Sequence, residues 1–590
     1  MRYKNKINNL RLYCITYIIL IFLSIIFGYL IKNRVYQIEE FKLYNINEDK
    51  ITSDISFVGA KQLNEANSRF KSSIGDIHIN IYPVSAQDHF YRMNISSKNI
   101  LSEQDIKGIN EEYTKYIKND VKEISLVSFK AISKDAIASK AVDIIKNIFN
   151  VSIVFFSFCY LISKLDMNKC KKYANEKVLN VIGGILAILT ILIGYSITLS
   201  IMLIVLGLFF KYKKENNKFL AITFLSAFVI RIVTLVGMVI VSKVKSGIGM
   251  SYFQPDEIFY YWTGNQIYTS LAKGIWPNLA AIVENNQYGY NLFMGLVELF
   301  NKEIFFTAKL INCLVSSMLI PLTYRCTIRL FNDKRVAKVT TLILVVVPTF
   351  ILFSTYALRD MFITILILLI FYEVIEVMET KRNIFSTVFK VCIFSIMLVT
   401  LRIYAAIMIT AIWILYLILR FFEKREKNII IIFLISLLLL IPVEKLASHF
   451  YGFNIFNTFV SYFTNLGVIK YFTGLICSLV NLDFLTNIGG AVYSGKTIII
   501  RMFYPDTVLL VLSAPLFVMG IVAAYKKNKS ATIVLILLAI GFITVYKFQY
   551  GGWFLRTQLQ IFVFQYMFIA LGFSKFIGNK HLTGKFKFLE

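Results

Sequence analysis

Long apolar runs alternate with short polar segments along most of this chain. The first run occupies residues 12–31, and further runs follow one another through residues 143–218 and 219–575. Because about 20 apolar helical residues cross a hydrocarbon layer of about 30 Å, this pattern predicts about fourteen membrane-spanning helices. The predicted fold class is therefore an all-α polytopic membrane protein, with an N-terminal transmembrane helix within residues 1–31.

One segment interrupts the pattern. Residues 32–142 are mostly polar and contain no run long enough to cross a membrane. Residues 77–82 alternate between apolar and polar positions, as a half-buried strand does, whereas residues 103–118 have helical character. The sequence therefore predicts a small α+β domain between the first and second membrane helices. Since no catalytic motif occurs in it, we expect a binding or spacer domain.

Composition and charge support a membrane location and set the orientation. Hydrophobic residues make up 57% of the chain and charged residues only 17%, whereas about a quarter of a soluble protein is charged. The net charge of +28 would suggest a nucleic-acid partner in a soluble protein, but the lysines and arginines lie mainly in short loops between apolar runs. By the positive-inside rule these loops and the basic tail, residues 576–590, are cytoplasmic, as is the N-terminus.

The same rule places two long loops, residues 243–303 and 444–506, on the outer face of the membrane. Residues 468–482 are apolar but short, so we interpret them as a re-entrant or surface-lying helix. The Ile-, Lys- and Asn-rich usage favours a bacterial protein of the cytoplasmic membrane. No nucleic-acid partner is expected.

The first outer loop carries an adjacent acidic pair, Asp256 and Glu257. Carboxylates at the edge of a membrane span are costly and indicate a functional site. The predicted topology brings further polar residues to the same face, at the ends of other spans. They are Arg359 and Asp360, Arg402 and Tyr404, Lys496, Arg501 and Asp506, and Arg556 and Gln558. Arginines bind phosphate with paired donors, and a carboxylate acts as a general base, so this set suits a reaction on a phosphate-bearing lipid.

These residues resemble a known group of enzymes. The pair Asp256-Glu257 with Tyr260 and Tyr261, a helix ending at Gly274, and the run Tyr290-Asn291-Leu292-Phe293-Met294-Gly295 are similar to the first outer loop of GT-C glycosyltransferases. The resemblance is to the family-39-like branch, which includes protein mannosyltransferases and lipid A aminoarabinose transferases. It continues through Arg231, Ala308-Lys309-Leu310-Ile311-Asn312, Arg359-Asp360 after Pro348, and Leu555-Arg556, and covers residues 219–573.

Two departures from the family pattern are visible. Lys309 stands where the family has arginine, and Gln287-Tyr288-Gly289-Tyr290 replaces a Pro-Pro-Leu-Tyr motif. The second departure leaves the acceptor class open.

The resemblance implies an enzyme that takes a sugar from a polyprenyl-phosphate donor and transfers it, with inversion, to a lipid, glycan or protein hydroxyl at the outer face. Asp256 would be the general base, with Glu257 and Asp360 as further catalytic residues. The donor phosphate would be bound by Arg402, Arg501, Arg556 and Lys496, and the substrate by Tyr260, Tyr261, Arg359 and Tyr404. Whether a divalent cation, Mg²⁺ or Mn²⁺, binds at Asp256 and Asp360 is left open by the sequence.

The same residues also have simpler, structural explanations. Asp256 follows Pro255 and could cap a helix, and arginines at span ends also snorkel towards the interface. Arg231, in the middle of an apolar run, suggests a structural partner to a buried carboxylate. At the level of the whole protein, the alternatives are a polysaccharide polymerase or ligase, a lipid or solute transporter, and a membrane scaffold.

Overall fold

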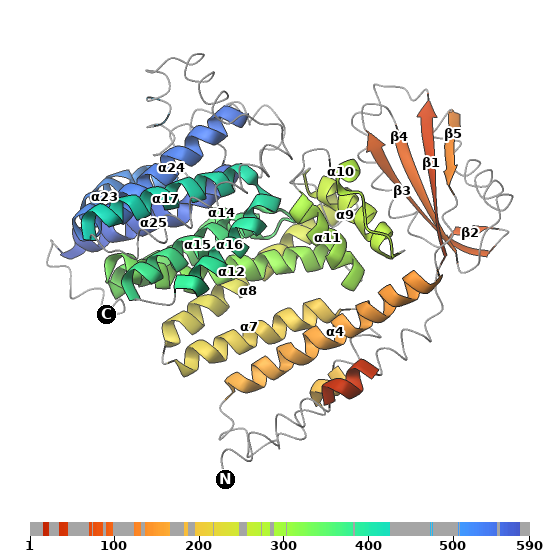
Figure 1. The fold of residues 1–590 in the computed structure, drawn as a ribbon, viewed down its shortest axis with the longest axis horizontal. Helices are drawn as coiled ribbons and strands as arrows, with labels where there is room; N and C mark the ends of the chain where they lie inside the picture. Colours follow the sequence, from red (N-terminus) through yellow and green to blue (C-terminus); the bar gives the residue numbers. More distant parts are fainter. Residues whose placement is uncertain are drawn as a thin grey trace, which may run out of the picture. The chain divides into compact units, whose positions relative to one another are not determined.

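A computed structural model describes most of the apolar helices and part of the polar N-terminal segment (Figure 1). The described residues are 16–22, 35–44, 70–72, 75–85, 90–97, 123–130, 136–165, 182–186, 195–215, 217–246, 256–272, 274–283, 288–301, 304–380, 384–424, 473, 475, 506, 508–550 and 555–578.

The described part of the polar segment forms an antiparallel five-stranded sheet with strand order β2-β3-β4-β1-β5 (Figure 1). The strands are β1 (Val35–Tyr44), β2 (Phe70–Ser72), β3 (Gly75–Ser85), β4 (Phe90–Ser97) and β5 (Glu123–Lys130). The central strand β4 pairs Ile95 with Ile79 of β3 and with Gln37 of β1. The alternating residues 77–82 thus lie in a strand, whereas the predicted helix 103–118 lies outside the described residues, so the α+β assignment stays a prediction.

Five described helices are long and apolar enough to cross a membrane, and the bent pair α13–α14 makes a sixth if it counts as one span. The five are α4 (Ala136–Lys164), α7 (Ser196–Lys214), α8 (Lys218–Ser246), α12 (Ile304–Phe331) and α25 (Leu555–Gly578). These helices agree with the predicted multi-pass, helical membrane protein. The count of about fourteen spans stays a prediction.

The remaining described helices include three from residues 243–303, the loop predicted to lie on the outer face, and five from the C-terminal half. The loop helices are α9 (Asp256–Ala272), α10 (Leu279–Ile282) and α11 (Tyr288–Phe300). The others are α15 (Asp360–Thr380), α16 (Ile384–Leu401), α17 (Ile403–Lys424), α23 (Ala514–Lys527) and α24 (Lys529–Tyr550). Helices α13 (Lys334–Val346) and α14 (Pro348–Ser354) meet at a bend of 53°.

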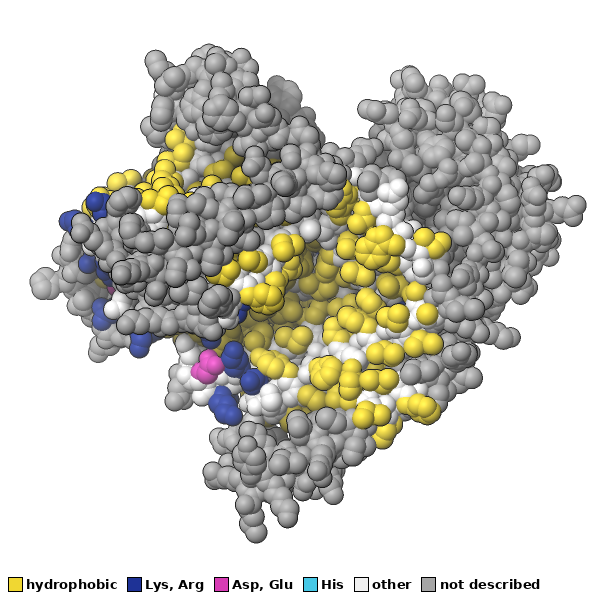
Figure 2. All heavy atoms as spheres, in the orientation of Figure 1, with side chains coloured by type: hydrophobic (Ala, Val, Ile, Leu, Met, Phe, Trp, Pro, Cys, Tyr) yellow, Lys and Arg dark blue, Asp and Glu magenta, His cyan; other side chains and the backbone are white. Residues whose placement is uncertain are grey.

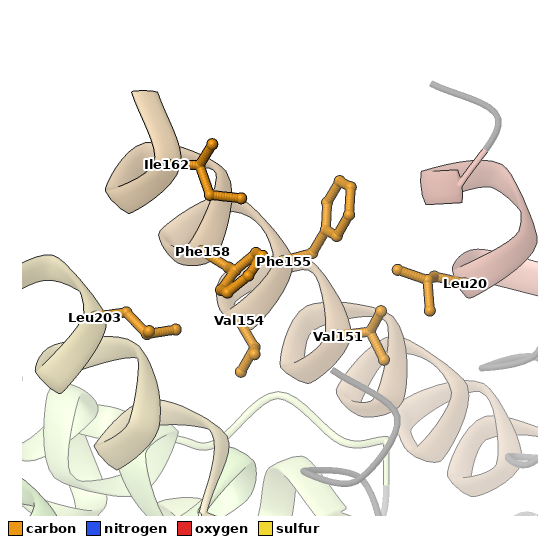
Figure 3. Close-up of a cluster of buried hydrophobic side chains, with 7 residues drawn as sticks. All are labelled: Leu20, Val151, Val154, Phe155, Phe158, Ile162 and Leu203. Atoms are coloured by element: carbon orange, nitrogen blue, oxygen red, sulfur yellow. The ribbon is translucent and has the colours of Figure 1, made fainter. Parts of the chain in front are cut away.

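The chain divides into two compact units. The first comprises Met1–Leu203, Val236–Asn278 and Met294–Thr307, and the second comprises Ile204–Leu235, Leu279–Phe293 and Ala308–Glu590. In the first unit a hydrophobic cluster is centred on α4, whose residues Val151, Phe155 and Phe158 lie between Leu20 and Leu203 (Figure 3). Leu20 belongs to the described helical residues 16–22 of the predicted first span.

Apolar side chains remain exposed along single faces of the long helices. On α8 the exposed residues Ile222, Val229, Val233, Ile240 and Val244 recur at helical spacing. Figure 2 shows hydrophobic side chains over much of the surface that the described residues present in that view. A soluble protein rarely exposes such faces, and a surrounding hydrocarbon layer accounts for them.

Helices of the second unit also approach closely through glycine. A Cβ atom at Gly520 of α23 would fall on the carbonyl of Phe568, and one at Gly572 of α25 would fall on the carbonyl of Leu516. The two backbones can therefore pack together only because both positions lack a side chain.

Candidate functional site

Four charged residues and a tyrosine meet at the ends of four helices in the second unit. Asp360 is the first residue of α15, Arg402 occupies the one-residue gap between α16 and α17, and Arg556 is the second residue of α25. The Oδ2 atom of Asp360 lies 2.7 Å from Nε of Arg556, and its Oδ1 atom lies 3.5 Å from a terminal nitrogen of Arg402. With Arg359 and Tyr404 they form what we call the Asp360 cluster.

The other members are fixed by neighbouring groups. Arg359 donates from a terminal nitrogen to the carbonyl oxygen of Leu401, at 3.0 Å. The guanidinium carbon of Arg402 lies 5.5 Å from the ring centroid of Tyr404, a cation–π contact. Asp360 and Arg402 are buried, whereas the Arg556 side chain is 20% exposed. An incoming ligand can therefore reach the cluster at Arg556.

The electrostatics of the cluster favour an anion. Burial by itself would raise the pKa of Asp360, but the attraction of Arg556, Arg402 and Arg359, with the hydrogen bond from Arg556, lowers that pKa below its ordinary value. Asp360 is thus ionised beside three arginines. Guanidinium groups match the geometry of a phosphate, so arginines gathered at one place suit a phosphate ligand.

A broken helix leads the chain into this cluster. Pro348 has no N–H, so the carbonyl of Leu344, four residues earlier, loses its normal helical partner. Arg231 donates to that carbonyl oxygen at 3.2 Å. Its other described partners are the Ser316 hydroxyl at 2.8 Å and the Ala227 carbonyl at 3.0 Å. The suggestion of a carboxylate partner for Arg231 is therefore not met among the described residues, because the proline creates a backbone acceptor instead.

Asp506 holds the other side of the break. Its carboxylate accepts hydrogen bonds from the backbone N–H and the hydroxyl of Thr349, near the start of α14. Val347 precedes α14 and offers no side-chain cap, so Asp506 takes that role from 157 residues along the chain. Sequence reasoning noted Asp506 as a polar loop end, but no local signal connects it with Thr349.

Helix α12 then fixes the turn between α14 and Asp360. The side-chain nitrogen of Asn312 donates to the carbonyl oxygens of Tyr356 and Leu358, at 2.6 and 2.9 Å. Asn312 is fully buried and lies in the motif Ala308-Lys309-Leu310-Ile311-Asn312. It therefore positions the backbone immediately before Arg359 and Asp360.

The acidic pair Asp256-Glu257 belongs to the first unit. Asp256 is the first residue of α9 and is exposed, whereas Glu257 and Tyr260 are buried and Tyr261 is half-buried. Asp256 and Glu257 both lie in the first turn, where acidic residues also stabilise a helix. Gly264 of α9 packs directly on Met294 at α11, which fixes this helix within the loop.

The structure thus brings together Arg359, Asp360, Arg402, Tyr404 and Arg556, and places Asp256, Glu257, Tyr260 and Tyr261 on one helix. Lys496 and Arg501 lie outside the described residues. Within the described part of the chain, no group of three or more His, Cys, Asp or Glu side chains could hold a metal ion. At Asp360 a cation would also face two guanidinium groups, which repel it.

The sequence matches no known family of proteins, and no curated protein resembles it significantly.

Proposed function

We propose that this protein is a membrane glycosyltransferase of the GT-C type. It moves a sugar from a polyprenyl-phosphate donor to a cell-envelope acceptor at the outer face of a bacterial cytoplasmic membrane. The observation that carries the proposal is the Asp360 cluster, in which three arginines surround one buried carboxylate at the ends of apolar helices. Such a cluster suits a phosphate whose lipid tail lies in the adjoining hydrocarbon.

The three arginines fit the course of the reaction. The acceptor oxygen attacks the anomeric carbon, the bond from that carbon to the phosphate oxygen breaks, and the bonding electrons leave with the polyprenyl phosphate. The donor is a phosphodiester with one negative charge, and the released phosphate carries about −1.5 to −2 at neutral pH. Arginines that bind the growing charge stabilise the transition state more than the bound donor, which is what accelerates a reaction.

The residues then divide into roles. Arg402 and Arg556 bind the donor phosphate, with Arg501 and Lys496 as further ligands, and Asp360 orients the two arginines that it contacts. Asp256 is the general base that takes the proton from the acceptor hydroxyl. Glu257 is a second catalytic candidate beside Asp256. Tyr260 and Tyr261 in the first unit, and Arg359 and Tyr404 in the second, are the proposed substrate-binding residues. We propose no metal ion at Asp360.

The test is transfer of labelled sugar from a panel of polyprenyl-phosphate sugars to extracted envelope lipids and glycans, by the purified protein in liposomes. A hydrogen bond to a charged group contributes about 1.5–3 kcal/mol, so Arg556→Gln should lower kcat/KM about 10- to 150-fold. Asp256→Asn should abolish transfer. Arg325→Gln is the matched control, because Arg325 is a half-exposed arginine paired with Glu215, outside the cluster.

The variants test the proposed roles of individual residues. Transfer that persists in Asp256→Asn would remove that residue as the base, and equal losses in Arg556→Gln and Arg325→Gln would remove the phosphate-binding role of the cluster. A folded wild-type protein that transfers no sugar from any donor would refute the assignment as a glycosyltransferase.

A further inference from the structure

A second polar cluster lies in the first unit and shares no residue with the groups assigned above. It joins the C-terminal end of α11 to α4, α7 and the start of α12. We call it the Glu298 cluster, and its members are Asn147, Asn150, Ser196, Thr198, Glu298, Asn301 and Thr307.

Hydrogen bonds connect the four segments. The Ser196 hydroxyl of α7 donates to Oδ1 of Asn150 in α4 at 2.7 Å. The side-chain nitrogen of Asn301, just after α11, donates to the hydroxyl oxygen of Thr307 in α12 at 2.5 Å. Thr307 also lies within hydrogen-bonding distance of Thr198, with 3.3 Å between the hydroxyl oxygens. The cluster is therefore a built contact between helices and not a solvated surface.

Three polar atoms of this cluster are covered and have no hydrogen-bond partner among the described residues. They are Oε2 of Glu298, Oδ1 of Asn301 and Nδ2 of Asn147. Asn301 and Asn147 are 3% and 5% exposed. A covered polar atom without a partner destabilises a fold, so three in one place call for an explanation.

The positions of the two oxygens, Oε2 of Glu298 and Oδ1 of Asn301, supply an explanation. Glu298 and Asn301 are three residues apart, and Asn301 continues the helical hydrogen-bonding pattern of α11 through its N–H to the Val297 carbonyl. Side chains at this spacing are neighbours on one helix face. Two oxygens that only accept cannot bond to each other, but a proton on one of them turns the pair into a donor and an acceptor.

We propose that the Glu298 cluster is a proton-binding site, in which Glu298 is a neutral carboxylic acid at pH 7 and donates its proton to Oδ1 of Asn301. One proton thereby accounts for two of the three covered atoms, Oε2 of Glu298 and Oδ1 of Asn301.

The charges around the site agree with a bound proton. Burial raises the pKa of Glu298 to about 8, and the attraction of Lys146 in α4 lowers it only in part. Asp143 stands one turn before Lys146, and α9 carries its described charges, Asp256 and Glu257, in its first turn. Residues 196–203 of α7 and 304–307 of α12 bring no charge.

The site makes the contact between these helices depend on pH. A pKa of about 8 implies that roughly 99% of Glu298 is protonated at pH 6 and about 10% at pH 9. The folded-state pKa lies above that of an exposed glutamate, so the site stabilises the fold fully below pH 4 and loses this contribution as pH rises through 8. The proposal does not depend on the proposed glycosyltransferase activity.

The experiment is a melting curve of the full-length protein in detergent at several pH values, for wild type and Glu298→Gln. Glutamine stays neutral and can donate to Asn301, so its Tm at pH 4 should equal that of wild type. At pH 9 wild type should melt lower than Glu298→Gln. Infrared difference spectra between pH 6 and pH 9 should show a carboxylic-acid carbonyl band that Glu298→Gln lacks, and Asn301→Leu should move its midpoint to lower pH.

Glu373→Gln is the matched control, since Glu373 is a buried glutamate that accepts from Lys390 at 3.0 and 3.2 Å and should lose stability at pH 6. A lower Tm for Glu298→Gln than for wild type at pH 6 would show that the carboxylate is required and would overturn the proposal. Parallel pH profiles for the two proteins would also overturn it. So would stabilisation by Na⁺ or Ca²⁺ in wild type alone, because a metal ion would then occupy the site.

Discussion

Replacing Asn312 by leucine tests how the fold positions the Asp360 cluster. Leucine has nearly the same shape as asparagine but cannot donate, so the carbonyls of Tyr356 and Leu358 lose a fully buried partner. Each buried carbonyl left without a donor costs about 1–3 kcal/mol, and Oδ1 of Asn312, itself without a described partner, returns part of this when removed. We expect a net loss of about 2–4 kcal/mol in the free energy of unfolding.

The matched control is Ser317→Ala on the same helix. Ser317 is also fully buried, but its hydroxyl donates only to the Cys313 carbonyl of its own helix. Thermal melts of both variants in the same detergent compare the two losses directly, and binding of polyprenyl phosphate reports on the cluster. A melting temperature of Asn312→Leu equal to that of Ser317→Ala, with unchanged binding, would refute the positioning role of Asn312.

Two further substitutions test the packing and the charges of the second unit. Asp360→Asn leaves Arg402 and Arg556 without their carboxylate, and we expect it to cost about 3–5 kcal/mol in thermal melts; an unchanged melting temperature would contradict the buried ion pairs. Gly520→Ala places a methyl group on the Phe568 carbonyl and should cost at least about 1–3 kcal/mol, whereas Gly237→Ala, with open space around it, should be neutral or stabilising. Equal melting temperatures for the two alanine variants would argue against the close contact of α23 and α25.

Much of the Asp360 cluster could be predicted from the sequence. The alternation of apolar runs and basic loops predicts that Asp360, Arg402 and Arg556 lie on one side of the membrane, and the structure brings these three residues into contact. Residues at the ends of membrane helices on the same side share one narrow layer of the protein. The predicted topology therefore restricts how far apart these three residues can lie. The apolar character of the long helices could also be predicted, because it follows directly from their composition.

The supporting contacts could not be predicted in this way. Arg231 and Asp506 bond to backbone groups 113 and 157 residues away, and no periodicity encodes which backbone group is exposed by a distant proline. The Glu298 cluster could not be predicted from the sequence, because its members are common polar residues that form no motif. Only the three-dimensional contacts show which of their atoms lack a partner.

The two sides of the break at Pro348 are stabilised by residues that are synthesised at different times. Arg231 is synthesised before Leu344, so one side of the break can be satisfied as soon as α13 enters the membrane. The other side requires Asp506, which follows Thr349 by 157 residues. At translation rates of about 5–20 residues per second, the start of α14 waits about 8–30 s for its cap. During that time the bent span is exposed to chaperones and proteases, and a truncation before residue 506 would leave it in that state permanently.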